Sequence, residues 1–149
     1  FNVFGPREQH KESMSSVVYH FYNQIKSSKK VKLFKGSHGY EDGEQRRDFI
    51  YVVDTVKVKL WFMKNPSISG IYNVGTGKCR SFNDVATSVI SYFKEGEIEY
   101  IDFPNNLKEQ YQAYTEADIT NIKKAGYIDS FTELEDGVHE YLEWLSNIK

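Results

Sequence analysis

The sequence predicts one domain of mixed α/β class, in which short strands alternate with amphipathic helices. Several stretches carry apolar residues at spacings of three and four, as helices with one packed face do. The segments between them are short, rich in aromatic and β-branched residues, and bounded by glycine or proline. A chain of 149 residues can bury about 68–70% of its unfolded surface. These observations leave the order of the strands open.

Composition narrows the class of protein. The net charge of −2 gives no indication of the excess positive charge that is typical of nucleic-acid-binding proteins. No apolar run reaches the roughly 20 residues that a membrane-spanning helix needs. Eleven tyrosines and ten phenylalanines supply core, and such residues also line sugar and base pockets. The single Cys79 excludes an intramolecular disulfide and is compatible with a reducing cytosol, where we expect the protein to work.

The first thirteen residues organise the chain. Residues 1–4 form a short apolar strand that ends at the turn signal Gly5-Pro6. A loop with several functional groups follows, and open α/β sheets bind ligands beyond the carboxyl ends of such strands. The loop carries Arg7, Glu8, His10 and Lys11. Because the chain starts inside a strand and without Met, we expect it to be the second part of a longer protein.

The next elements follow from periodicity. Val17, Val18, Phe21 and Ile25 recur at helical spacing, and residues 31–34 read as a strand. Residues 38–46 are polar and without periodicity, which predicts a mobile surface loop. A strand is expected over residues 47–52. Asp54 is then expected to cap a helix whose inward face holds Val56, Leu60 and Met63.

The second half begins with an expected strand over residues 70–77. Ser81 and Asp84 have the spacing of a capping box, ahead of an apolar helical face. Residues 98–103 are expected to form a strand, 111–115 an extended segment, and 117–125 a short helix that ends at Gly126. A last helix is expected to be capped by Thr132 and Glu135.

Pattern alone leaves the candidate sites open. Gly75 and Gly77 are read as a structural turn, because the pattern of a phosphate-binding loop is incomplete. No spacing of histidine or cysteine predicts a metal site. Lys11 is either a solvated charge or a functional group. Arg47 either pairs with Asp48 at the surface or faces a phosphate, whose oxygens match its planar fork. Tyr111 either packs or contacts a ligand.

Three motifs nevertheless resemble the C-terminal half of extended short-chain dehydrogenases/reductases that act on nucleotide sugars. They are Asn2-Val-Phe-Gly-Pro-Arg7, Arg47-Asp-Phe-Ile-Tyr-Val-x-Asp54 and Tyr72-Asn-Val-Gly-Thr-Gly77. Five further stretches resemble the ADP-L-glycero-D-manno-heptose 6-epimerase family. They are Gly5-Pro-Arg-Glu-x-His-Lys-x-Ser-Met14, Lys32-Leu-Phe-Lys-Gly-Ser37, Ile98-Glu-Tyr-Ile-x-Phe-Pro104, Tyr111-Gln-Ala-Tyr-Thr-x-Ala-Asp118 and Gly137-Val-x-Glu-Tyr-x-x-Trp-Leu145.

The resemblance implies an NADP-dependent epimerase that inverts C6″ of an ADP-heptose through a transient ketone, in the synthesis of the lipopolysaccharide inner core. It implies that residues 1–149 form the nucleotide-sugar binding lobe, with the end of a Rossmann-domain strand at 1–5. It implies that Lys11 is a catalytic acid/base group that also contacts the cofactor, as does Val3. A lysine that works as a base near neutral pH needs its pKa lowered by desolvation and by positive neighbours such as the oxidised nicotinamide.

The same resemblance implies a set of substrate contacts. Asn2, Ser13 and His20 are expected to contact the substrate, although His20 by itself reads as an ordinary helix residue. The ADP portion is expected to be enclosed by Phe34, Lys35, Gly36, Ser37, Arg47 and Tyr111. The loop over 38–46 looks longer than is usual in the family, which bears on how Arg47 approaches the ligand.

The resemblance also implies what lies outside this chain. We expect the dinucleotide-binding glycine motif and the catalytic Tyr-x-x-x-Lys pair to be absent, and the chain alone to be inactive. Apolar surface is then expected where the Rossmann domain packs, and the protein is expected to form a homo-oligomer. Two alternatives stay open, another nucleotide-sugar epimerase or dehydratase of the superfamily and a non-catalytic nucleotide-sugar binding module.

Overall fold

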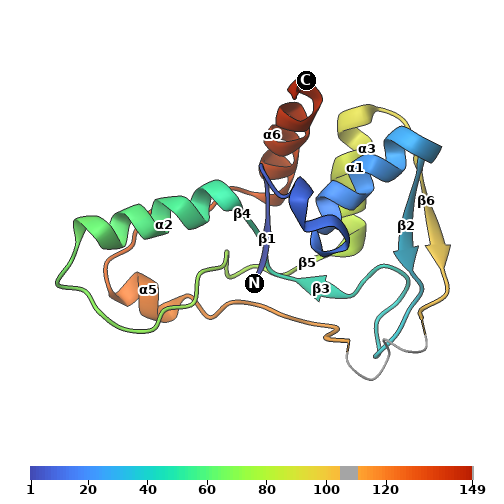
Figure 1. Ribbon diagram of the computed structural model, residues 1–149. Helices are drawn as coiled ribbons and strands as arrows, with labels where there is room; N and C mark the ends of the chain where they lie inside the picture. The colour runs from blue at the N-terminus through green and yellow to red at the C-terminus, as the bar shows by residue number, and fades with distance from the viewer. Residues whose placement is uncertain (105–110, 149) are drawn as a thin grey trace.

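A computed structural model describes residues 1–104 and 111–148 and confirms the α/β class (Figure 1). The first elements are β1 (Asn2–Phe4), the 3-10 helix η1 (Gln9–Met14), α1 (Val17–Ser28), β2 (Lys30–Phe34), β3 (Arg46–Arg47), β4 (Phe49–Tyr51) and α2 (Val52–Lys64). The later elements are β5 (Arg80–Ser81), α3 (Phe82–Phe93), β6 (Glu97–Ile101), α5 (Thr120–Lys124) and α6 (Leu134–Asn147).

The strands pair two by two. β1 and β4 are parallel, with Asn2 opposite Phe49 and Phe4 opposite Tyr51. β2 and β6 are also parallel over five residue pairs, and β3 and β5 are antiparallel over two. Parallel pairs need crossover connections. The connection from β1 to β4 contains α1 and β2, and the connection from β2 to β6 contains α3.

The larger hydrophobic core lies where α1, α3 and α6 meet β1, β2 and β4 (Figure 1). α6 approaches the parallel pair β1–β4 closely, because Gly137 faces it. A Cβ atom at Gly137 would lie 3.0 Å from the Phe4 ring and 3.2 Å from Cβ of Tyr51. The buried members of this core on the three helices are Val18, Phe21, Tyr22, Ile25, Val85, Ala86, Val89, Leu134, Val138, Tyr141, Leu142 and Leu145.

A smaller core lies between α2 and α5, on the other side of β1 and β4 in Figure 1. Val58, Ile122 and Tyr127 are buried there, and Trp61 packs edge-on against Tyr127 with ring centroids 5.6 Å apart. The chain thus buries apolar surface in two clusters, which flank the β1–β4 pair.

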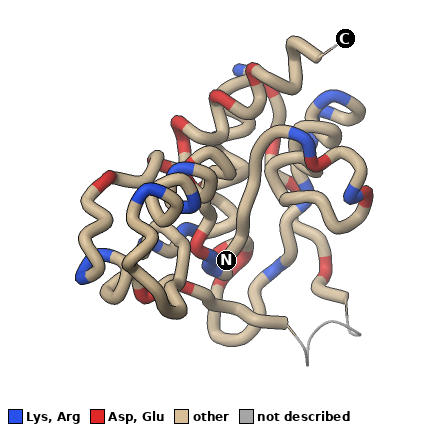
Figure 2. Tube along the Cα trace, turned by 60° about the vertical axis from the view of Figure 1, so that its left-hand side comes forward, with Lys and Arg blue, Asp and Glu red and all other residues tan. Residues whose placement is uncertain are grey.

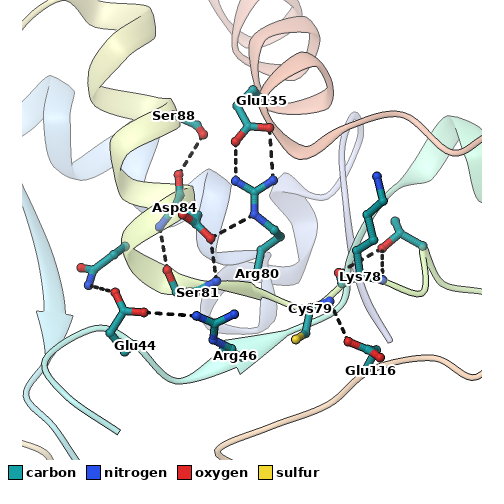
Figure 3. Close-up of polar contacts among 12 residues, drawn as sticks. Glu44, Arg46, Lys78, Cys79, Arg80, Ser81, Asp84, Ser88, Glu116 and Glu135 are labelled. Atoms are coloured by element: carbon teal, nitrogen blue, oxygen red, sulfur yellow. Dashed lines mark hydrogen bonds and ion pairs between the residues drawn. The ribbon is translucent and has the colours of Figure 1, made fainter.

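The predicted capping box is confirmed. Ser81 Oγ accepts from the backbone N–H of Asp84, whose carboxylate accepts from the backbone N–H of Ser81. Arg80 extends this cap to α6, because its guanidinium bonds Asp84 Oδ2 at 3.0 Å and both carboxylate oxygens of Glu135 (Figure 3). One arginine therefore joins the start of α3 to the start of α6.

The predicted inward face of α2 is wrong. Val56, Leu60 and Met63 are 47%, 48% and 76% exposed, whereas Asp54 and Val58 are buried. Asp54 lies inside the first turn rather than at the cap, and its carboxylate accepts from Thr132 N at 2.6 Å and Lys57 Nζ at 2.9 Å. Apolar residues occur on all sides of this helix, so their periodicity does not determine which side faces the core. The hydrogen bonds of the Asp54 carboxylate determine it instead.

Other boundaries also differ from the predictions. Residues 70–77 form no ladder and instead turn at Gly70 and Gly77, both with positive φ. The strand expected over 47–52 is divided between β3 and β4, with Asp48 between them. The last helix starts at Leu134 after Glu133, and Thr132 donates its N–H to Asp54 rather than capping with its side chain. The short helix spans Thr120–Lys124 only.

Asp48 accounts for this division of the strand. Its side chain is fully buried and accepts four hydrogen bonds, from Thr76 N (2.9 Å), Thr76 Oγ1 (2.7 Å), Gly77 N (2.9 Å) and Ala117 N (3.1 Å). A Cβ atom at Gly75 would lie 2.7 Å from its Oδ2. The glycine turn is therefore structural, as predicted, and its N–H groups bind a carboxylate of the chain itself.

We predict that Asp48→Asn lowers the free energy of unfolding by roughly 3 kcal/mol, because an amide NH₂ replaces an acceptor and leaves buried N–H donors without a partner. Urea unfolding measures the change. Asp129→Asn is the matched control, because Asp129 is exposed and the same substitution there costs a few tenths of a kcal/mol at most. A loss at Asp48 no larger than the control's would contradict the proposed role of this carboxylate.

We predict that Arg80→Met lowers the free energy of unfolding by roughly 1 kcal/mol at pH 7, through loss of its two carboxylate partners. The hydrogen bond from Arg80 lowers the pKa of Glu135. This stabilisation is therefore complete above the ordinary glutamate pKa of about 4.3 and is lost as pH falls through the lowered value.

The difference between wild type and Arg80→Met is thus expected to shrink in urea titrations at acidic pH, as pH falls through the lowered pKa of Glu135. Lys78→Met is the control, because the Lys78–Glu133 pair is more than half exposed on both sides and contributes little. A difference that persists unchanged at the acidic pH would show that Arg80 acts by packing rather than by its charge.

Candidate functional site

β1 and η1 border a cavity of about 180 Å³ that brings three of the predicted site residues together. Asn2 and Val3 reach it from β1, and Lys11 reaches it from η1. We call this cavity the lysine pocket. Its lining residues are Asn2, Val3, Phe4, Glu8, Lys11, Met14, Ser15, Ser16, Val17 and Phe49. The amine of Lys11 and the amide of Asn2 thus border one small cavity beside β1, whose first two residues are exposed.

A second cavity of about 300 Å³ holds three more of the predicted residues, His20, Phe34 and Tyr111. We call it the aromatic pocket. Its lining residues are Val17, His20, Phe21, Gln24, Lys32, Leu33, Phe34, Gln45, Phe82 and Tyr111. Aromatic walls with a few polar groups are typical of pockets that bind a flat organic group.

The two pockets adjoin at the first turn of α1. Val17 lines both, and His20 Nε2 lies 3.3 Å from the carbonyl oxygen of Ser13. Ser13 is exposed and follows Lys11 on η1. Ser13 lines neither pocket but contacts His20 of the aromatic pocket, and Val17 is the residue that the two linings share.

Arg47 lies beside the aromatic pocket. Its guanidinium carbon is 5.0 Å from the centre of the Tyr111 ring and 5.9 Å from that of Phe82. The residue is 8% exposed, and burial lowers the pKa of its guanidinium. The alternative of a surface pair with Asp48 is excluded, because the Asp48 carboxylate bonds elsewhere and none of the ion pairs in the described part of the chain includes Arg47.

This arginine stands out against the rest of the charge distribution. Figure 2 shows Lys and Arg interspersed with Asp and Glu along the described chain. The neighbouring Arg46 follows that pattern, since it is about half exposed and pairs with Glu44 at 3.7 Å. A buried cation without an acidic partner is costly, and a bound anion removes that cost. Arg47 therefore indicates an anionic group at the aromatic pocket.

The turn over residues 34–37 closes the far end of the aromatic pocket. Gln45 is 1% exposed, and its Nε2 donates to Lys35 O at 3.2 Å and to Ser37 Oγ at 3.1 Å. Gly36 N donates to Asp42 Oδ1 at 2.7 Å. The Lys35 side chain pairs with the exposed Asp102 at 2.7 Å, away from the pocket lining. The segment 38–46, expected to be a surface loop throughout, thus contributes a buried side chain that fixes this turn.

Several lining residues were not among the predicted ones. Gln24 lies one helical turn after His20, so its spacing was a usable signal. Glu8, Gln45 and Phe82 carried no comparable signal, because their burial depends on packing between distant segments. Phe103 also contacts the predicted set, with its ring centre 4.8 Å from those of both Phe34 and Tyr111.

A Tyr-x-x-x-Lys spacing is present after all, at Tyr22 and Lys26, so the expectation that the pattern is absent is wrong. Both residues lie on α1, and Lys26 Nζ donates to the Tyr22 hydroxyl at 3.4 Å. Tyr22 is 7% exposed, packs against Phe93 and lines neither pocket. Tyr22 therefore belongs to the core and Lys26 is exposed, so this pair is not part of the site.

A third cavity, of about 290 Å³, lies on the side of residues 128–134 and contains none of the predicted residues. Two of its cations are already paired, Lys78 with Glu133 and Arg80 with Glu135, the second of which Figure 3 shows. Its charges are thus largely satisfied within the chain, whereas Arg47 belongs to none of the ion pairs of the described residues.

In residues 1–104 and 111–148, no group of three or more His, Cys, Asp or Glu residues is placed to hold a metal ion. No helix there is both long and apolar enough to cross a membrane.

Comparison with known proteins places this geometry in a family. The family model described as NAD dependent epimerase/dehydratase matches residues 1–75. The chain is similar to the ADP-L-glycero-D-manno-heptose-6-epimerase of Alkalilimnicola ehrlichii, with 55% identity over 143 residues, 96% of this chain and 45% of the relative. The enzyme of the same name from Thiobacillus denitrificans is 48% identical over 160 residues, 97% of this chain and 48% of the relative.

Solved structures agree. Helicobacter pylori ADP-L-glycero-D-manno-heptose-6-epimerase superposes with a TM-score of 0.83 at 32% identity, over 99% of this chain and 43% of that one. A UDP-glucose 4-epimerase of Thermus thermophilus in complex with NAD shares the fold, with a TM-score of 0.77 at 20% identity.

The chain spans less than half the length of the curated relatives that it matches. Its α/β fold is that of the extended short-chain dehydrogenase/reductase epimerases, as the sequence predicted. The chain therefore belongs to the NAD dependent epimerase/dehydratase family.

Proposed function

We propose that this chain is the C-terminal part of an NADP-dependent epimerase that inverts C6″ of ADP-D-glycero-D-manno-heptose, for the inner core of lipopolysaccharide. The single observation that carries the proposal is the buried Arg47 beside Tyr111, without an acidic partner in the described chain, at a pocket that adjoins the lysine pocket. The similarity to ADP-heptose epimerases supports the choice of substrate. We place the reaction in the cytoplasm.

The aromatic pocket is the proposed site of the ADP group. Arg47 offers a planar fork of N–H donors to phosphate oxygens, while Tyr111 and Phe34 present ring faces. The turn Lys35–Ser37 encloses the same group through its backbone, because the Lys35 side chain is turned toward Asp102. The sugar then extends past Val17 toward the lysine pocket.

The lysine pocket is the proposed site of proton transfer. Lys11 acts as one of two acid/base groups at C6″, while Asn2, Ser13 and His20 orient the sugar. Two groups are needed because the hydride leaves one face of the carbon and returns to the other through a keto intermediate. The second group, the family's catalytic tyrosine, belongs to the N-terminal part of the full-length protein.

The cofactor fits the open side of this pocket. Val3 is 40% exposed on β1 and borders the same cavity as Lys11, so an apolar side chain and an amine face the space where a nicotinamide would lie. Bound NADP would supply the hydride acceptor and donor for C6″. Val3 would pack against the nicotinamide ring, and Lys11 would move the proton of the hydroxyl on C6″.

The N-terminal dinucleotide-binding domain is the proposed partner of an exposed apolar stripe on α2. Val53, Val56, Leu60 and Met63 are 40–76% exposed and recur at spacings of three and four. Parallel strands such as β1 and β4 are usually covered on both faces. Without that domain the chain is inactive, and the full-length protein works as a homo-oligomer.

We predict that ADP-mannose binds and that Arg47→Ala raises its Kd by about 10–100-fold, the range for loss of a charge-assisted hydrogen bond. Calorimetry on this chain, and on the full-length protein if this chain does not bind, measures the change. Arg46→Ala is the matched control, because Arg46 is exposed and paired with Glu44. Equal Kd values for both variants and wild type would contradict a phosphate contact at Arg47.

We predict that Lys11→Met in the full-length protein lowers kcat for ADP-D-glycero-D-manno-heptose by at least about 100-fold with little change in KM, as loss of a general acid/base group does. Lys26→Met and Tyr22→Phe are the controls, and they are expected to retain kcat because neither residue lines the two pockets. Full activity of Lys11→Met would rule out this lysine as the acid/base group.

A further inference from the structure

We propose that Glu8 is a positioning residue, whose buried carboxylate holds Lys11 and Ser13 in place at the lysine pocket. The proposal rests on the role proposed above for Lys11. It concerns a residue that carried no functional signal in the sequence, and it follows from three observations on residues 7–16.

The first observation is the set of contacts of Glu8, which is 3% exposed. Its Oε2 accepts from Ser16 N at 2.7 Å, and its Oε1 accepts from Ser16 Oγ at 2.5 Å. Its backbone oxygen accepts from Lys11 N at 2.9 Å and from Ser15 Oγ at 3.0 Å. Glu8 thus bonds Lys11 and, beyond Ser13, Ser15 and Ser16, and these bonds close residues 8–16 into a ring.

The second observation is the conformation of that segment. Glu12, between Lys11 and Ser13, has φ 49° and ψ −118°, which a residue with a side chain rarely adopts. Arg7, directly before Glu8, also has a positive φ of 72°. Such strained backbone persists only where surrounding contacts enforce it, and it gathers at functional sites. The ring of bonds made by Glu8 supplies the contacts that enforce it here.

The third observation is how the buried charge is stabilised. None of the ion pairs in the described part of the chain includes Glu8. Its carboxylate lies instead at the start of the twelve-residue helix α1, where Ser16 is the N-cap and its Oγ also accepts from Tyr19 N at 3.3 Å. A helix N-terminus favours a negative charge. The anchor for the strained segment is therefore α1, which packs in the larger core.

The position of Lys11 is thus determined by a chain of contacts that runs from the core through α1, Ser16 and Glu8. Glu8 borders the same pocket as Lys11 but is bonded to Ser16 rather than directed at the amine. Loss of the carboxylate frees the segment to relax around Glu12 and moves Lys11 away from the reacting carbon.

The test uses the full-length protein with Glu8→Ala and the milder Glu8→Gln, which keeps one acceptor for Ser16 N. Asp54→Asn is the matched control, because Asp54 is also buried and also accepts a backbone N–H, but lies away from both pockets. Two quantities are measured, the amide hydrogen exchange of residues 9–16 and the separate kcat and KM for the ADP-sugar.

We expect Glu8→Ala to speed exchange in residues 9–16 and to lower kcat about 100-fold, as a misplacement of about 1 Å does, with KM within about threefold of wild type. Glu8→Gln is expected to lie between Glu8→Ala and wild type in both measurements. Asp54→Asn is expected to leave exchange in residues 9–16 unchanged. A selective loss of kcat separates positioning from a general loss of stability.

Three results would overturn the proposal. The first is unchanged exchange in residues 9–16 of Glu8→Ala, and the second is faster exchange with kcat retained. The third is equally fast exchange of residues 9–16 in Asp54→Asn, because the effect would then follow stability alone. If the wild-type protein does not turn over the ADP-heptose, the proposed function fails, and the exchange of residues 9–16 decides the role of Glu8 independently.

Discussion

The buried carboxylate of Asp48 is the interaction on which the site depends. It draws the turn at Thr76–Gly77 and the backbone at Ala117 onto the start of β4 through four hydrogen bonds. Because the Asp48 carboxylate accepts hydrogen bonds from these donors, it forms no ion pair with the preceding Arg47, whose guanidinium lies against the Tyr111 ring. One residue thus organises the packing on one side of the chain, and on the other side it leaves Arg47 outside all ion pairs of the described residues.

The two pockets are built from segments far apart in the sequence. The lysine pocket comes from residues 2–17 and Phe49, whereas the aromatic pocket adds β2, Gln45, Phe82 and Tyr111. α1 is common to both, and it is fixed in the larger core by Val18, Phe21 and Ile25. Packing of one amphipathic helix therefore determines how far the proposed nucleotide site lies from the proposed proton-transfer site.

The sequence predicted those features that depend on neighbours along the chain. The capping box at Ser81 and the helix that starts at Val17 are determined by residues close in sequence, so both were predicted. The motif resemblance singled out Lys11, which the structure places in the lining of the lysine pocket. The orientation of α2 depends on the hydrogen bond from Thr132 N to the Asp54 carboxylate. The conformation of residues 70–77 depends on the hydrogen bond from Gly77 N to the Asp48 carboxylate, and both bonds join residues far apart in sequence. The burial of Glu8 has the same non-local origin, and no periodicity reports it.

The division of the apolar surface into two clusters gives the chain two optical reporters. Trp61 packs in the smaller cluster between α2 and α5, and Trp144 packs against the larger one from α6, and these are the only tryptophans of the sequence. Tryptophan emission therefore carries one signal from each cluster. Coincident fluorescence transitions in Trp61→Phe and Trp144→Phe would mean that both clusters melt as one cooperative unit, and separate transitions would assign an order to their loss.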